Sequence, residues 1–190
     1  MDSQIERLIE KGEHRAALAA LVDAHGAALG RFCAGMLGSV HDGEEALQDA
    51  LVQVLGAMPT FRGGEVRPWV FGIARRVCAD LLRKRGRRRS LWGRLFGHGE
   101  EAAITPTDGL VRVALERALL RLSPGQREAL LLRYQLGLDA TEVADVLQIS
   151  HDAARKRISL ALQALRTDLI EEENHDHALR SSHDSAVVRS

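Results

Sequence analysis

The 190-residue sequence lacks the features on which several classes of protein depend. Aromatic residues make up only 4% of it, and no stretch alternates β-branched with polar residues, so a sheet-based core is not expected. It contains no G-x-G-x-x-G or Walker phosphate-binding motif, and no nucleophile–base pair or carboxylate dyad, which argues against an enzyme. No apolar run is long enough to span a bilayer. The charged N-terminus, MDSQIERLIEKGEHR, has no secretory signal, so we expect a cytoplasmic protein with no membrane insertion.

Cysteine is also scarce, with Cys33 and Cys78 as the only two. Each lies in an apolar segment with helical spacing, and cytosolic thiols stay reduced. We therefore expect two reduced core thiols rather than a disulfide or a redox pair. No metal-ligand spacing surrounds either cysteine, and neither a metal nor a cofactor is expected.

Apolar residues, dominated by leucine and alanine, make up 45% of the sequence, which favours helices. We predict an all-α fold of two small helical domains, residues 1–85 and 110–170, joined by a flexible basic linker at 86–109. The linker is rich in glycine and shows no sustained period. Its Trp92 and Phe96 should pack back on a domain or contact a partner. An acidic tail, 171–190, is expected to be disordered; a metal site at His175, His177 and His183 is the less favoured interpretation.

The first domain should begin with two helices between Ile5 and Leu37, broken near Gly12. Asp42 followed by Glu45 resembles a capping box and predicts a helix from Glu44 to Met58, ended by Pro59. Its inner face would bury Ala46, Leu47, Ala50, Leu51, Val54 and Leu55. Its outer face would carry Glu45, Gln48, Asp49 and Gln53.

Charge is strongly segregated, although the 26 basic and 26 acidic residues cancel over the whole chain. Residues 1–60 carry a net charge of −5 and the tail from Thr167 one of −4, whereas residues 62–94 carry +9. Such a basic stretch indicates a polyanionic partner, or else a solvated basic helix face. It follows the turn Gly63-Gly64 and has Pro68 in the first helical turn. At about 100° per residue, the apolar side is Val70, Ile73, Ala74, Val77 and Leu81, and the opposite side carries Arg75, Arg76 and Arg83.

The second domain should contain a helix from Leu110, and another that starts at Ser123-Pro124 and turns Leu130, Leu131 and Tyr134 inward until Gly137 ends it. Asp139 and Glu142 then form a capping pair before a short helix to Leu147. After the turn Gln148-Ile149-Ser150, Ser150 caps a further helix. Its apolar face is Ala154, Ile158, Ala161, Leu162 and Leu165. Its polar face is Asp152, Arg155, Lys156, Ser159, Gln163 and Arg166.

A short helix, a three-residue turn and a helix with a basic exposed face are typical of a DNA-binding helix-turn-helix. An ordinary helical hairpin within a bundle is the alternative. In the DNA-binding interpretation, Arg155 and Lys156 would lie at base edges or phosphates in the major groove.

Taken together, residues 13–169 resemble the extracytoplasmic-function (ECF) sigma factors of bacterial RNA polymerase. HDGEEALQDALVQVL resembles their polymerase-docking helix, and FRGGEVRPWVFGIARRVCADLLRKR their loop and helix that melt and read the minus-ten promoter element. LSPGQREALLLRYQLGLDATEVADVLQIS with HDAARKRISLALQALR resembles the domain that binds the minus-thirty-five element.

The resemblance implies three groups of site residues. Polymerase would be contacted by Glu45, Gln48, Asp49 and Gln53. The minus-ten element, as duplex and melted strand, would be contacted by Phe61, Arg62, Gly63, Arg67, Trp69, Arg75, Arg76, Arg83 and Arg85. The minus-thirty-five element would be contacted by Ser150, His151, Asp152, Arg155, Lys156, Ser159 and Gln163. It also implies an anti-sigma factor as a partner, which could hold the protein at the membrane.

The sequence departs from the family pattern at a few positions. Gln148 stands where the turn usually has glycine. Leu160, Leu162 and Gln163 replace residues of the recognition helix that are often basic, which implies weaker binding to DNA phosphates. Two other functions remain open from the residues themselves. One is a stand-alone dimeric helix-turn-helix regulator, and the other is a sigma-like adaptor that sequesters a regulator.

Overall fold

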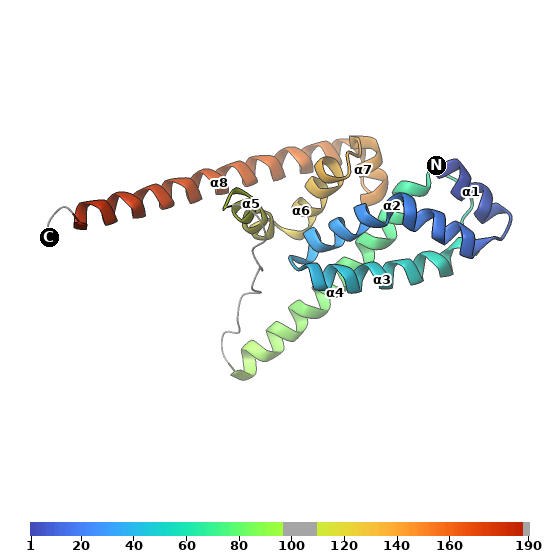
Figure 1. The fold of residues 1–190 in the computed structure, drawn as a ribbon, viewed down its shortest axis with the longest axis horizontal. Helices are drawn as coiled ribbons and strands as arrows, with labels where there is room; N and C mark the ends of the chain where they lie inside the picture. The colour runs from blue at the N-terminus through green and yellow to red at the C-terminus, as the bar shows by residue number, and fades with distance from the viewer. Residues whose placement is uncertain (97–109, 188–190) are drawn as a thin grey trace.

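The computed structural model describes the backbone of residues 1–96 and 110–187, and the side chains of residues 1–86 and 114–171. Within these ranges every regular element is a helix. The prediction of an all-α fold is therefore confirmed. Figure 1 shows a body of packed helices from which two helix ends project.

The first domain consists of α1 (Asp2–Glu10), α2 (His14–Leu37), α3 (Val40–Ala57), a short 3-10 turn (Met58–Thr60) and α4 (Val66–Phe96). Helices α2, α3 and α4 pack side by side around a core in which the rings of Phe32 and Phe71 meet edge to face, 5.8 Å apart. The crossing of α2 and α3 is very close, because a Cβ atom at Gly43 would lie 2.6 Å from the backbone nitrogen of Ala34. Glycine is thus required at this crossing.

The start of α3 differs from the prediction. The helix begins at Val40 rather than Glu44, and its N-cap is Ser39, whose hydroxyl accepts a hydrogen bond from the backbone N–H of Asp42 at 3.3 Å. The prediction of Asp42 as the cap is wrong because the nearer hydroxyl already satisfies the free backbone donors. The prediction that Leu55 is buried is also wrong, since 36% of it is exposed.

The second domain consists of α5 (Leu110–Arg121), α6 (Pro124–Leu130), a π-helical turn η2 (Leu131–Gln135), α7 (Ala140–Leu147) and α8 (His151–Val187). A capping box begins α7 at Asp139, as predicted, and another begins α6 at Ser123, where a helix start was predicted. Tyr134 was expected inward, and that prediction is wrong, because the residue is 60% exposed. The wider π turn changes the angle per residue, so a 3.6-residue period no longer places this side chain.

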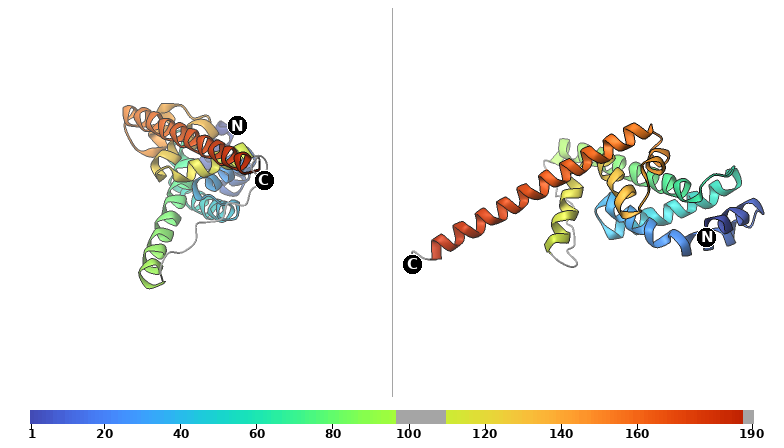
Figure 2. Two further views of the ribbon diagram at one scale, coloured as in Figure 1. Left: turned by 90° about the vertical axis from the view of Figure 1, so that its left-hand side faces the viewer. Right: turned by 90° about the horizontal axis from the view of Figure 1, so that it is seen from above.

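Two helices continue past the predicted domain boundaries. Helix α4 runs to Phe96 although a linker was expected from residue 86, and α8 runs to Val187 although a disordered tail was expected from residue 171. Both ends extend away from the body in different directions (Figures 1 and 2). Once a helix is nucleated, each added residue costs little. Residues 97–109, and the side chains of Trp92, Phe96, His175, His177 and His183, lie outside the described part.

The two domains share one apolar core. Leu132, Leu138 and Val143 of the second domain belong to the same buried cluster as Phe32 and Phe71 of the first. The domains approach closely at α2 and η2, where a Cβ atom on Gly35 would lie 3.0 Å from a methyl carbon of Leu131, and more closely still at Gly38, where it would lie 2.7 Å from a methyl carbon of Leu120. The absence of a side chain at position 35 therefore allows the second domain to rest directly on α2.

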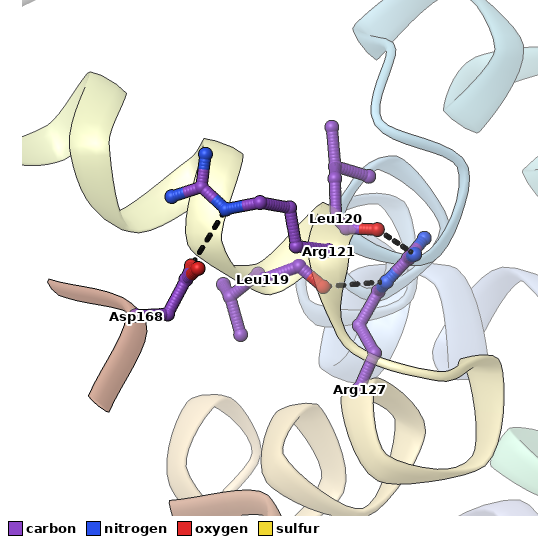
Figure 3. A network of polar contacts seen from close by, with 5 residues as sticks. All are labelled: Leu119, Leu120, Arg121, Arg127 and Asp168. Carbon is purple, nitrogen blue, oxygen red and sulfur yellow. Dashed lines mark hydrogen bonds and ion pairs between the residues drawn. The ribbon is translucent and has the colours of Figure 1, made fainter. Parts of the chain in front are cut away.

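Arg127 is the polar centre of this contact (Figure 3). It is 6% exposed, and its guanidinium donates to the backbone oxygens of Leu119 at 2.9 Å and Leu120 at 2.8 Å. It also crosses to the first domain and donates to the backbone oxygen of Met36 at 2.6 Å. These are carbonyls near the C-terminal ends of α5 and α2, which have no helical partner of their own. One buried side chain therefore joins the ends of two helices from different domains.

We expect Arg127→Met to destabilise the protein by about 3 kcal/mol, because it removes several hydrogen bonds from a charged donor and leaves buried carbonyls unsatisfied. The measurement is the free energy of unfolding from urea denaturation. Arg166→Met on the exposed face of α8 is the matched control and should change this free energy by less than about 0.5 kcal/mol. Equal effects of the two substitutions would contradict the role of Arg127.

Candidate nucleic-acid interface

The loop before α4 is exposed and lies next to two aromatic rings in contact. Arg62, Gly63, Gly64 and Glu65 are all exposed. Beneath them, the rings of Phe61 and Trp69 lie 4.7 Å apart, and both side chains pack against the core. The predicted loop residues Phe61, Arg62 and Gly63 therefore lie next to the ring of Trp69.

Three arginines of α4 remain accessible, in different degrees. Arg76 is exposed, with no hydrogen bond or ion pair among the described residues. Arg83 is exposed and forms an ion pair with Asp80 on its own helix. Arg85 is 37% exposed and pairs with Asp42 of α3. Of the predicted basic face, Arg76 and Arg83 are therefore exposed.

Arg67 and Arg75, predicted for the same DNA-contacting face, are instead held by the second domain. Arg67 donates to the backbone oxygen of Leu136, and Nε of Arg75 lies 2.7 Å from a carboxylate oxygen of Glu128. The N–H of Arg75 does not point along a hydrogen-bond direction, so the contact is an ion pair. Burial raises the pKa of Glu128, while Arg75 and Arg157 act in the opposite direction. The helical wheel placed Arg75 toward solvent because it takes no account of the other domain.

The helix-turn-helix has the predicted geometry. Asp139 accepts from the backbone N–H of Thr141 at 2.7 Å and of Glu142 at 2.9 Å, and these bonds lower its pKa. At the turn, Gln148 takes the left-handed conformation, with φ at +55°, that glycine would adopt most easily. Its side-chain nitrogen donates to the backbone oxygen of Asp145 at 2.7 Å. Glutamine therefore forms the turn and contributes a hydrogen bond to it.

The N-terminal part of α8 presents the predicted polar face. Ser150 caps this helix by accepting from the backbone N–H of Ala153 at 3.3 Å. Leu160 is 47% exposed and lies off the apolar face. The buried side of the helix is formed by Ala154, Ile158 and Ala161. The exposed side carries Ser150, His151, Asp152, Arg155, Lys156, Ser159 and Gln163.

The outer face of α3 carries the third group of predicted residues. Glu45, Gln48, Asp49 and Gln53 are all exposed. Sequence reasoning missed the apolar part of this surface, where Val52 is 71% exposed beside them. The sequence could have indicated this apolar patch, since Val52 lies one helical turn after Gln48 and therefore on the same face. The face is thus acidic with an apolar patch.

Sequence reasoning also missed the proximity of the two cysteines. Both are free and 0% exposed, as expected of core thiols. A hydrogen bond between them lowers the pKa of Cys33 and, together with burial, raises that of Cys78. No group of metal-ligating side chains occurs in the described part of the chain, and no described helix is long and apolar enough to cross a membrane.

Comparison with known proteins assigns both domains. The family model of sigma-70 region 2 matches residues 21–88, and that of sigma-70 region 4 matches residues 112–165. The ECF sigma factor SigL of Mycobacterium tuberculosis is 29% identical over 162 residues, covering 82% of this chain and 90% of SigL. SigC of the same species is 34% identical over 163 residues, covering 83% and 85%.

Two solved structures share the fold. CnrH, in complex with the cytosolic domain of CnrY, has a TM-score of 0.68 at 28% identity, covering 90% of this chain and 97% of CnrH. RpoE of Bartonella quintana, in complex with the anti-sigma factor NepR, has a TM-score of 0.67 at 26% identity, covering 83% and 96%. Together with the two matched regions and their order, these likenesses show that the chain belongs to the ECF sigma factors, the non-catalytic subunits that give RNA polymerase its promoter specificity.

Proposed function

We propose that this sigma factor opens promoter DNA with the loop Phe61–Arg67 and helix α4, and reads the minus-thirty-five element with the N-terminal part of α8. The observation that carries the proposal is the pair of exposed basic surfaces, one in each domain. One surrounds Arg76, beside the paired rings of Phe61 and Trp69, and the other contains Arg155 and Lys156.

The loop is suited to capture a base from the melted strand. Extruding a base from the stack costs a few kcal/mol, which contacts to the flipped base and the backbone have to offset. The rings of Phe61 and Trp69 offer an apolar surface under the loop, and Arg62 and Arg76 supply positive charge near it. The small residue Gly72, one turn before Arg76, leaves room for the backbone of the strand.

The outer face of α3 is the proposed contact with core polymerase. Its exposed carboxylates Glu45 and Asp49 suit a basic partner surface, and Val52 adds an apolar contact that the charged residues surround. Polymerase binding places the protein with the nucleoid in the cytoplasm.

We also propose an anti-sigma factor as a partner. The support is that CnrH and RpoE, which resemble this chain in fold, were each solved with a bound partner. Purification of the tagged protein from its native cells should recover a further small protein in addition to polymerase. Recovery of polymerase subunits alone under every growth condition would argue against it.

The central experiment is run-off transcription with core polymerase from the source bacterium and a pool of randomised promoters. We expect selection of a bipartite promoter that is used only when this protein is added. A footprint of the protein alone on a palindromic site, without polymerase-dependent initiation, would instead favour a stand-alone regulator.

We expect Arg76→Ala to reduce open-complex formation about tenfold, the effect of losing one charge-assisted phosphate contact. The dependence of binding on salt should also weaken, by about one ion per phosphate lost. Permanganate footprinting of the melted strand measures the first effect, and a salt titration the second. Arg76→Lys keeps the charge and should retain most of the activity, so a similar loss in both variants would contradict a phosphate contact.

For the second domain, Arg155→Ala should relax the preference for the minus-thirty-five sequence by about 1–3 kcal/mol, roughly 5- to 150-fold. The measurement compares initiation at the selected promoter with initiation at the same promoter carrying a scrambled upstream element. Arg166→Ala, on the exposed face of the same helix but three turns further on, is the control. If the preference survives in Arg155→Ala, Arg155 does not read bases.

A further inference from the structure

The first turn of α8, the recognition helix of the helix-turn-helix, carries an acidic side chain without a hydrogen-bond partner. Asp152 lies in this turn, and 97% of its side chain is exposed. The helix is capped by Ser150, which accepts from the backbone N–H of Ala153. Oδ1 of Asp152 is 3.9 Å from Nδ1 of His151, beyond hydrogen-bonding distance. Among the residues that the structure describes, no group donates to this carboxylate, so it is available to a ligand.

A carboxylate at this position opposes DNA binding unless a base donates a hydrogen bond to it. The first residues of a recognition helix are those that approach the base edges. There Asp152 is repelled by the phosphates, and it loses water that something has to replace. Further along the same helix, the exposed Leu160 and Gln163 add no positive charge to offset this cost. The groove must therefore offer Asp152 a donor.

The major groove presents only two kinds of donor, the N4 amino group of cytosine and the N6 amino group of adenine. Adenine places the acceptor N7 beside its amino group, and a carboxylate has no proton to offer that acceptor. Guanine and thymine present acceptors alone, which repel a carboxylate. Cytosine is thus the one base whose groove edge suits Asp152 completely.

We propose that Asp152 selects a cytosine in the upstream promoter element, by accepting a hydrogen bond from its N4 amino group and by repelling the other bases. The inference rests on the proposed function, because it takes the N-terminal part of α8 as the reader of that element. It goes further in assigning a base to one residue, and in assigning part of the selectivity to repulsion. Arg155 lies three residues further on, on the same side of the helix, and can donate to the guanine of the same or the neighbouring pair.

A purely structural role for Asp152 predicts a different result. An acidic residue in the first turn of a helix stabilises the helix through its dipole. Loss of that interaction would lower initiation by the same factor at every promoter, because it acts on the protein before any DNA is bound. Loss of a base contact changes the preference at one base pair only. The pattern over all positions of the upstream element therefore separates the two roles.

The experiment is run-off transcription by the full-length protein with core polymerase, on the selected promoter and on versions with each upstream base pair replaced by the other three. For the wild type we expect one G·C pair at which replacement lowers initiation about 5- to 150-fold. Asp152→Ala should reduce this effect to about twofold or less at that pair alone. Asp152→Asn, which has nearly the same shape, should prefer adenine in place of the cytosine, since an amide can bind both N6 and N7. Glu171→Ala, exposed on the same helix, is the control and should keep the wild-type pattern.

Failure of this proposal is distinguishable from failure of the proposed function. If Asp152→Ala keeps the wild-type preference at every position, or weakens initiation equally on all promoters, Asp152 does not read a base, while the proposed function stands. If the wild type itself has no preference at any upstream position, α8 does not read the promoter, and the inference fails with the proposed function. A switch from cytosine to adenine in Asp152→Asn supports the contact directly, because a change in helix stability cannot produce it.

Discussion

The side chain of Arg127 supplies hydrogen-bond donors to carbonyl groups at the C-terminal ends of both α2 and α5. The last carbonyls of a helix have no backbone donor, and burying them without a partner is costly. Arg127, carried by α6, reaches the ends of both helices at once and is itself removed from water. The first and second domains therefore meet at one charged group whose hydrogen bonds depend on both. Since the shared apolar core lies next to this group, the orientation of the second domain on α2 depends on it too.

This orientation explains why the two basic surfaces have different environments. The helix-turn-helix turns α7 toward the first domain, and α8 then presents its polar side to solvent. Helix α4 belongs to the contact, so its arginines differ according to the side of the helix on which they lie. Arg67 and Arg75 lie within reach of the second domain, while Arg76, the next residue along, points away from it. A rotation of about 100° between consecutive residues is enough to separate a masked arginine from a free one.

Local signals predicted most of the fold and of the site. Capping pairs such as Asp139 with Glu142, and the apolar period around Ile158, depend only on neighbours in sequence, and the structure agrees with them. The predictions that differ depend on contacts between segments far apart. Arg75 was assigned to solvent because no local pattern indicates that Glu128 would face it. The adjacency of Cys33 and Cys78 was missed for the same reason. Tyr134 was misplaced because a π turn alters the period on which the prediction relied.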